Sequence, residues 1–317
     1  LWAWGVNSQG ELGVGYKGGN VLTPEQVYLP NDSGVQDFAL GRGASAVLMG
    51  DGTVWGWGYI FYGNAMPYND PCHVEELDGK GIHTVTASDD RGFFLFQAGS
   101  GTEEDPSRMY GWGDDVYGWY LTDENFNSRY PREIAFPESQ YLTDVRVSEG
   151  TIFAVVDGPE PGIYAWGRND YGQVGNGEKS NNDPVTVPYK TTGYSGSAPR
   201  YVTPGWGGSP VALQEDGTLW VWGYDKLLVP PSIGTNLPIL EEPTRIGIDH
   251  IAEAAQSGHH LVALRQDGLV YVRGSNSVGQ RGVPEHFGET TEYEFDLNSP
   301  VQKQDGTPLA LVTYDGP

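Results

Sequence analysis

The chain has 317 residues, of which 42 are acidic and 18 are basic, so its formal net charge is −24 at pH 7. Nucleic-acid-binding proteins usually carry a basic surface, and this charge therefore argues against direct binding of DNA or RNA. No stretch reaches 18 apolar residues, so no insertion into a membrane is expected. An acidic surface serves solubility in many proteins, and the alternative is that it attracts a basic partner or divalent cations.

The cysteine content limits the kinds of cross-link that the chain can make. Cys72 is the only cysteine, which excludes an internal disulfide. It follows Pro71 on an expected strand, and we expect it to be a small buried hydrophobic residue. The chain begins at Leu1 without an initiating methionine or a signal peptide, so we interpret it as a processed or partial chain.

A five-residue phrase returns six times, beginning near residues 1, 54, 109, 163, 219 and 270. Five copies end in Trp-Gly and the sixth ends in Arg273-Gly274. The closing glycines are 53, 55, 54, 56 and 51 residues apart, and a period of this length indicates a repeat architecture. Because the tryptophans recur at the repeat period, we expect them to pack between repeats. The structural repeat residues are Trp4, Gly5, Trp57, Gly58, Trp112, Gly113, Trp166, Gly167, Trp222 and Gly223.

Each repeat contains four strand signals, taken here in chain order. The phrase itself alternates large and small apolar residues and is the first signal. The second follows a proline, at 24–27, 71–74, 131–134, 184–187 and 243–246. The third approaches a glycine, at 35–43, 142–150 and 251–258. The fourth is an apolar run before Asp-Gly, which predicts a tight hairpin into the next phrase, at 46–49, 153–156, 211–213 and 261–264.

These signals predict the fold class. No segment shows a sustained 3.6-residue period, so helices are expected to be sparse. Six repeats of four antiparallel strands predict an all-β chain, and radial repetition of four-stranded sheets is a β-propeller, here with six blades in one domain over residues 1–317. Residues 309–317 joined to Leu1–Gly5 read like an internal repeat. We therefore expect the N-terminal strand to complete the last blade and to hide its edges.

After the phrase, three repeats continue as Asn-x-x-Gly-Gln-Leu-Gly or a close variant, at 7–13, 169–175 and 276–282. Residues 257–264 add a Gly-His-His element that leads into a strand. Together these motifs resemble the repeat of the regulator-of-chromosome-condensation family over essentially the whole chain. The resemblance implies a propeller whose faces grip proteins. The family's usual ring has seven blades, and the second, third and fifth repeats here lack the Asn run.

The sequence nominates no catalytic residue, no metal site and no cofactor. None of the six histidines has a zinc-ligand spacing, and His259-His260 falls where the family repeat has a structural histidine. Asp51-Gly52 and Asp216-Gly217 lack the leading serine of sialidase boxes, and we interpret them as hairpin turns. The acidic run at 88–91 is either a cation site or a solvated turn. The many carboxylates leave open a dispersed pair for glycoside hydrolysis.

Aromatic residues outside the repeat period are the candidates for a contact surface. Tyrosine and tryptophan favour interfaces, and loops on a rigid scaffold carry binding. The alternative for each of them is packing within its own loop. The candidates are Tyr59, Phe61, Tyr62, Tyr68, Trp119, Tyr120, Tyr189, Tyr194 and Trp206.

These observations together favour a non-enzymatic binding or structural propeller. We expect an adhesive or structural component of a larger multi-protein assembly, such as a virion tail or a cell-surface appendage, that contacts a protein or glycan surface. An extracellular or virion location fits that interpretation. The alternative is a soluble regulator that binds one protein partner through a propeller face, and a glycoside hydrolase is the less favoured third interpretation.

Overall fold

The structure is a computed structural model that describes residues 1–30, 32–59, 68–88, 94–102, 104–113, 130–136, 141–158, 160–180, 183–205, 208–224, 239–257, 260–274, 276, 279, 281–282, 300–303, 305 and 307–310. β-Strands dominate these ranges, and the 3₁₀ helix η1 (Glu75–Leu77) is the one helical element among them. None of these residues lies in a helix with the length and apolar character needed to cross a membrane. The expected all-β chain with little helix is confirmed.

Twenty-one strands lie in the described ranges. From the N-terminus they are β1 (Trp2–Val6), β2 (Asn20–Gln26), β3 (Val35–Gly41), β4 (Ala44–Met49), β5 (Val54–Gly58), β6 (Tyr68–His73), β7 (Ile82–Ala87), β8 (Phe94–Ala98), β9 (Arg108–Trp112), β10 (Arg132–Ile134), β11 (Tyr141–Ser148), β12 (Thr151–Asp157), β13 (Gly162–Gly167) and β14 (Val185–Lys190). The rest are β15 (Pro199–Thr203), β16 (Val211–Gln214), β17 (Leu219–Tyr224), β18 (Ile239–Arg245), β19 (Ile251–Ser257), β20 (His260–Arg265) and β21 (Val270–Gly274).

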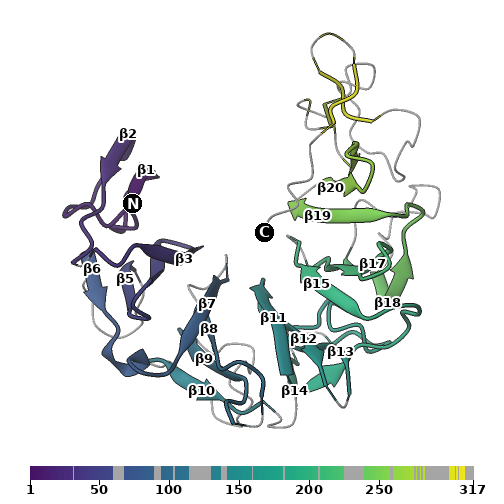
Figure 1. Cartoon of the computed structure of the whole chain (residues 1–317), viewed down its shortest axis with the longest axis horizontal. Helices are drawn as coiled ribbons and strands as arrows, with labels where there is room; N and C mark the ends of the chain where they lie inside the picture. Colours follow the sequence, from purple (N-terminus) through teal and green to yellow (C-terminus); the bar gives the residue numbers. More distant parts are fainter. Residues whose placement is uncertain are drawn as a thin grey trace. The chain divides into compact units, whose positions relative to one another are not determined.

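The strands form six sheets in which consecutive strands are neighbours (Figure 1). Four sheets contain four strands each, namely β3–β6, β7–β10, β11–β14 and β15–β18. In the described residues, β19–β21 form a three-stranded sheet and β1–β2 a two-stranded one. The hairpins predicted at Asp-Gly join β4 to β5, β16 to β17 and β20 to β21 as antiparallel pairs. The predicted unit of four antiparallel strands is therefore confirmed.

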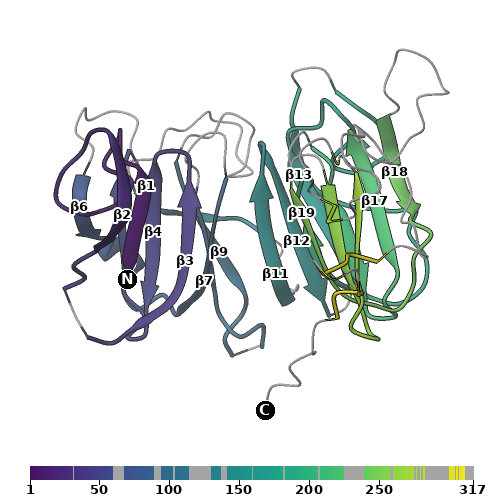
Figure 2. The same ribbon diagram turned by 90° about the horizontal axis from the view of Figure 1, so that it is seen from above.

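The chain divides into two compact units. Unit 1 comprises Leu1–Pro161, Trp166–Arg168 and Pro184–Pro188, and unit 2 comprises Gly162–Ala165, Asn169–Asp183 and Tyr189–Pro317. Within unit 1, β3 contacts β7 and β7 contacts β11, and the strands of each sheet lie alongside one another (Figure 2). Within unit 2, β15 and β16 contact β19. A single domain over 1–317 stays a prediction.

The Trp-Gly pair of the repeat phrase is a β-bulge. The register of the strand ladder shifts across Trp57 on β5 and across Trp222 on β17. Gly58 and Gly223 follow with φ angles of 86° and 84°, a conformation that residues with a Cβ rarely adopt. A bulge of this kind bends the strand and directs its side chain. This geometry explains why a glycine follows the tryptophan in every complete phrase.

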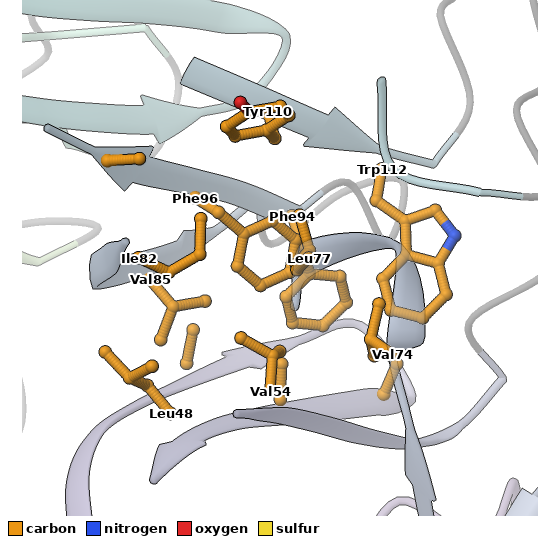
Figure 3. Close-up of a cluster of buried hydrophobic side chains, with 14 residues drawn as sticks. Leu48, Val54, Val74, Leu77, Ile82, Val85, Phe94, Phe96, Tyr110 and Trp112 are labelled. Carbon is orange, nitrogen blue, oxygen red and sulfur yellow. The ribbon is translucent and has the colours of Figure 1, made fainter. Parts of the chain in front are cut away.

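The main hydrophobic core of unit 1 lies between the β3–β6 and β7–β10 sheets. Leu48 and Val54 from the first sheet pack against Phe94 and Phe96 from the second, and all four are fully buried (Figure 3). Each such side chain contributes about 1.5–3 kcal/mol when it leaves water. Unit 2 has its own core between the β15–β18 and β19–β21 sheets. Buried side chains between neighbouring sheets thus support the strands, and the loops connect these strands.

The first strand has a largely exposed apolar face. Trp2, Trp4 and Val6 of β1 are 59%, 61% and 57% exposed in the described structure, where β1 pairs with β2. Residues 311–317, which the sequence places in the closing strand pair, lie outside the described residues. Completion of the last blade by β1 therefore stays a prediction from the sequence.

Candidate functional site

A buried asparagine shapes the loop that follows the phrase in the first, fourth and sixth repeats. Asn7, Asn169 and Asn276 are at most 1% exposed. The side-chain oxygen of each accepts a hydrogen bond from a main-chain N–H five residues later, which closes the loop. These bonds run from Leu12 N to Asn7 Oδ1 (3.2 Å), from Val174 N to Asn169 Oδ1 (3.0 Å) and from Arg281 N to Asn276 Oδ1 (2.9 Å). The Asn-x-x-Gly run is therefore a self-bonded turn and not a ligand loop.

A tryptophan of the next repeat fastens this loop to the neighbouring sheet. Trp57 Nε1 donates to the carbonyl oxygen of Glu11 at 2.9 Å, and Trp222 Nε1 donates to that of Gln173 at 2.7 Å. The last glycine of the loop, Gly13 or Gly175, lies so close that a Cβ would collide with the same indole. Both indole groups satisfy buried carbonyls, which makes the loops rigid.

Four of the five repeat tryptophans are buried in the described structure. Trp57, Trp112, Trp166 and Trp222 are at most 4% exposed. Trp4 is 61% exposed in the described structure, because β1 belongs to the sheet of two strands. The buried indoles of Trp57, Trp166 and Trp222 are therefore not accessible for stacking against a ligand, whereas part of Trp112 lines a cavity.

Unit 1 contains a cavity of about 150 Å³ beside β6 and η1. β6 is the last strand of its sheet, and Tyr68 and Cys72 of this strand line the cavity. The turn of η1 follows directly and is anchored by Leu77, which is 1% exposed and belongs to the core. Figure 3 shows Trp112, at the end of β9, beside Val74. The wall includes Tyr68, Cys72, Glu75, Glu76, Trp112 and Tyr130.

The charge in the cavity is negative. Burial raises the pKa of the Cys72 thiol, and the carboxylates of Glu75 and Glu76 raise it further. A neighbouring negative charge disfavours a thiolate, so Cys72 is not an activated nucleophile. Cys72 is also exposed, so the expectation of a buried residue is wrong. The side chains of the terminal strand β6 alternate between exposed and partly buried, and Cys72 falls on the exposed alternation.

The histidine of the cavity is already engaged. His73 Nε2 lies 2.9 Å from Asp78 Oδ1, and its ring stacks on Trp55 with the centroids 4.7 Å apart. These contacts fix the imidazole against its own sheet. No group of three or more metal-ligating side chains occurs in the part of the chain that the structure describes. The arrangement offers aromatic faces and carboxylates to a ligand, which suits binding.

Comparison with known proteins identifies the type of repeat in this chain. The sequence model of the Regulator of chromosome condensation (RCC1) repeat matches residues 1–48 and 162–208, which include two of the asparagine loops. The human E3 ubiquitin-protein ligase HERC2 is 25% identical over 294 residues, 89% of this chain and 6% of HERC2. The Ultraviolet-B receptor UVR8 of Arabidopsis thaliana is 24% identical over 77% of this chain and 54% of the receptor. The chain therefore spans only part of these relatives.

Solved structures agree with the sequence comparison. Prp20p from Saccharomyces cerevisiae matches 98% of this chain and 78% of its own with a TM-score of 0.76 at 19% identity. Human WBSCR16 matches 93% of this chain and 77% of its own with a TM-score of 0.69 at 18% identity. The chain contains RCC1-type repeats. At these identities the structural likeness shows the fold, and the fold class is the β-propeller that the repeats predict.

In this RCC1-type chain, four of the nine predicted contact residues can be placed. Tyr59 and Tyr68 of unit 1 are 42% and 47% exposed, and Tyr189 of unit 2 is 37% exposed. Tyr194 is partly buried, and its hydroxyl accepts a hydrogen bond from Ile163 N at 3.0 Å. Burial raises the pKa of Tyr194, and its contacts are those of loop packing. The candidates outside the described residues are Phe61, Tyr62, Trp119, Tyr120 and Trp206.

The aspartates of two Asp-Gly hairpins cap their turns. Asp51 Oδ1 accepts from Thr53 N at 3.0 Å and from Thr53 Oγ1 at 2.7 Å, and Asp216 makes the same pair of bonds with Thr218. These hydrogen bonds lower the pKa of both carboxyl groups. The interpretation of the Asp-Gly pairs as hairpin turns is consistent with this geometry. Each carboxylate therefore accepts hydrogen bonds within its own turn.

Of the residues that line the cavity, Tyr68 is the one that the sequence nominates for a contact surface. Tyr68 was a candidate because it interrupts a loop. Tyr130, Glu75 and Glu76 belong to no motif. Glu75 and Glu76 lie near Tyr68 because η1 directly follows β6, whereas Tyr130 comes from the segment before β10 of another sheet. The sequence does contain one weak indication of this site, because two adjacent glutamates directly follow the expected strand at 71–74.

Proposed function

We propose that this RCC1-type chain is a protein-binding module that acts as a regulator of one partner. The observation that carries the proposal is the fold match over 98% of the chain to Prp20p, a protein studied for its binding properties to Gsp1p and histones. A second structure shows Kap60 bound to yeast RCC1 (Prp20). This fold thus serves as a scaffold for several protein contacts, and rigid repeat loops suit the same use here.

The charge of the chain narrows the class of partner. A net charge of −24 favours association with a basic protein surface, because complementary charges steer encounter and suppress wrong partners. The predicted lack of nucleic acid binding rests on the same charge and stays a prediction. A glycan partner also remains untested.

The adhesive or structural interpretation is less well supported. The relatives give no support to a virion tail, to adhesion or to the extracellular or virion location that goes with them. The alternative in which one soluble partner is bound agrees better with Prp20p and its binding properties.

Catalysis is not part of the proposal. HERC2 is named a ligase and Nek9 a kinase, but this chain spans only 6% of HERC2 and 16% of mouse Nek9. Those activities therefore belong to much longer proteins. Glycoside hydrolysis is tested separately with chromogenic substrates. Turnover that disappears on substitution of one carboxylate would overturn the non-enzymatic interpretation.

The decisive experiment identifies the neighbours of the protein. The protein is cross-linked in its native source without denaturant, and the cross-linked peptides are identified by mass spectrometry. A single soluble protein that also forms a saturable complex with the purified chain supports the proposal. Cross-links to many copies of a particle or filament protein would overturn it in favour of the assembly interpretation.

A further inference from the structure

The cavity beside β6 has the size of a side-chain pocket. Its volume is about 150 Å³, similar to cavities that hold one benzene-sized group. Pockets for cofactors and drug-sized ligands are larger, about 300–1,000 Å³. The cavity therefore fits one long side chain from a partner and excludes a nucleotide or a large cofactor.

The uncompensated charge in the wall of the cavity is negative. Glu75 and Glu76 are exposed at the mouth, and neither has an ion-pair partner among the described residues. His73 is held by Asp78 and by its stack on Trp55. A cation that enters the cavity gains attraction from both glutamates, because a partly buried site screens charge less than open water does.

The aromatic residues in the wall of the cavity suit both the apolar stem and the charged head of a lysine or arginine side chain. Tyr68 and Tyr130 present exposed rings, and Trp112 contributes from the buried side beside Val74 (Figure 3). Aromatic faces attract lysine and arginine heads. The apolar stem of such a side chain packs well against apolar surface while its head stays polar. A neutral sugar would use the rings but would leave the two carboxylates without a counter-charge.

From these observations we propose that the cavity receives an arginine or lysine side chain of a protein partner. This inference deepens the proposed function and rests on it. Tyr68, Tyr130 and Trp112 enclose the side chain, and Glu75 and Glu76 pair with its charged head. The cavity then binds one side chain of the partner specifically, and the net negative charge of the chain attracts the basic surface around that side chain.

Cys72 gives a direct readout of occupancy because it is the only thiol of the chain and lines the cavity. The rate of its alkylation by iodoacetamide, a neutral reagent, is measured on the full chain with increasing amounts of a short arginine peptide. The matched probe is the same peptide with citrulline, which has the shape of arginine without its charge. We expect saturable protection by the arginine peptide and about tenfold weaker protection by the citrulline peptide.

Two pairs of variants test the carboxylates. Glu75→Gln with Glu76→Gln should weaken the protection by the arginine peptide about tenfold. Glu241→Gln with Glu242→Gln removes two charges from unit 2, outside this cavity, and should leave protection unchanged. Circular dichroism verifies that each variant is folded. Equal protection by the two peptides, loss of protection in both variants, or protection by a neutral oligosaccharide instead would overturn the proposal.

The same variants separate this inference from the proposed function. A protein partner that binds the native chain and the Glu75→Gln, Glu76→Gln variant with equal affinity would overturn the cavity proposal and leave the protein-binding function standing. Absence of any saturable protein partner would overturn the proposed function itself, whatever the arginine peptide does.

Discussion

The indole Nε1 of Trp222 donates a 2.7 Å hydrogen bond to the main-chain carbonyl of Gln173, 49 residues earlier in the chain. Trp222 is completely buried and Gln173 is 1% exposed, so water cannot replace this donor. Trp57 and Glu11 repeat the relationship 46 residues apart. One tryptophan therefore serves both the core of its own sheet and the loop of the preceding repeat.

Replacing Trp222 by phenylalanine should destabilise the protein. The change leaves the Gln173 carbonyl buried without a donor, which costs about 1–3 kcal/mol, and it also removes part of the buried ring. Trp220→Phe is the matched control, because Trp220 Nε1 donates only to the side chains of Gln214 and Thr218 at 3.2 and 3.3 Å. Urea unfolding followed by circular dichroism measures both. A similar or smaller loss for Trp222→Phe would contradict the structural role of its hydrogen bond.

Gly175→Ala should lower the free energy of unfolding by about 1–3 kcal/mol, the range for forcing extra atoms into a packed site. Its φ is 72°, and an added Cβ would lie 2.7 Å from Thr191 Cγ2 and 2.9 Å from Trp222 Nε1. Two alanine controls separate the causes. Gly52 has a φ of 84° and Gly247 has no unusual φ, and a Cβ at either meets nothing within 4 Å. Thermal unfolding should rank the loss Gly175 first, Gly52 second and Gly247 last, and any other order would argue against a tight fit at Gly175.

The turn at Asp216 should contribute an acid-dependent stability. Hydrogen bonds from Thr218 hold the pKa of Asp216 below its ordinary value in the folded state. A depressed pKa means that the ionised carboxylate stabilises the fold above the unfolded pKa of about 3.9, and that this contribution is lost as the pH falls through the folded pKa. Asp216→Asn should therefore be less stable than the native chain at pH 6, with a smaller difference at pH 2.

Glu215→Gln is the control for the loss of charge, because it removes the same charge from the adjacent exposed residue. It should leave the free energy of unfolding at pH 6 close to that of the native chain. Equal slopes for the native chain and Asp216→Asn would show that the turn hydrogen bonds do not favour the charged form.

The predicted completion of the last blade by the N-terminal strand can be tested by stability. Deletion of Leu1–Gly5 should lower the melting temperature sharply. Because that deletion also removes the pairing of β1 with β2, the double variant Trp2→Ser, Trp4→Ser is more informative. Both side chains are about 60% exposed in the described structure, so their replacement costs little unless a closing strand covers them. A melting temperature that stays within about 2 °C of the native value would contradict closure.

Local signals located the strands because alternation and turn chemistry act over a few residues. The segment 71–74 overlaps β6 (Tyr68–His73), with Pro71 inside the strand, and the Asp-Gly at 51–52 follows the end of β4 at Met49. The β-bulges were not predicted. The inner strand pairs shift register at Val35–Asp37 in β3 and at Ile82–Thr84 in β7, and no residue type marks these positions because the shift depends on the neighbouring strand.

The cavity could not be predicted for a similar reason. Tyr68 and Tyr130 belong to different repeats, and the sequence gives the spacing of repeats without saying which side chains meet between their sheets. Cys72 shows that a strand can be predicted from the sequence while the exposure of its side chains is not. Its place after a proline predicted a strand, which is confirmed, but its exposure follows from β6 being the last strand of its sheet.

The indole bonds of Trp57 and Trp222 each reach back to the loop of the preceding repeat. Donor and acceptor therefore recur together at the length of one repeat. Gain or loss of one whole repeat by recombination within the gene recreates a matching pair at the new junction, whereas an insertion of half a repeat leaves both groups unmatched. This spacing allows the number of repeats to change while the bonds of Trp57 and Trp222 are kept.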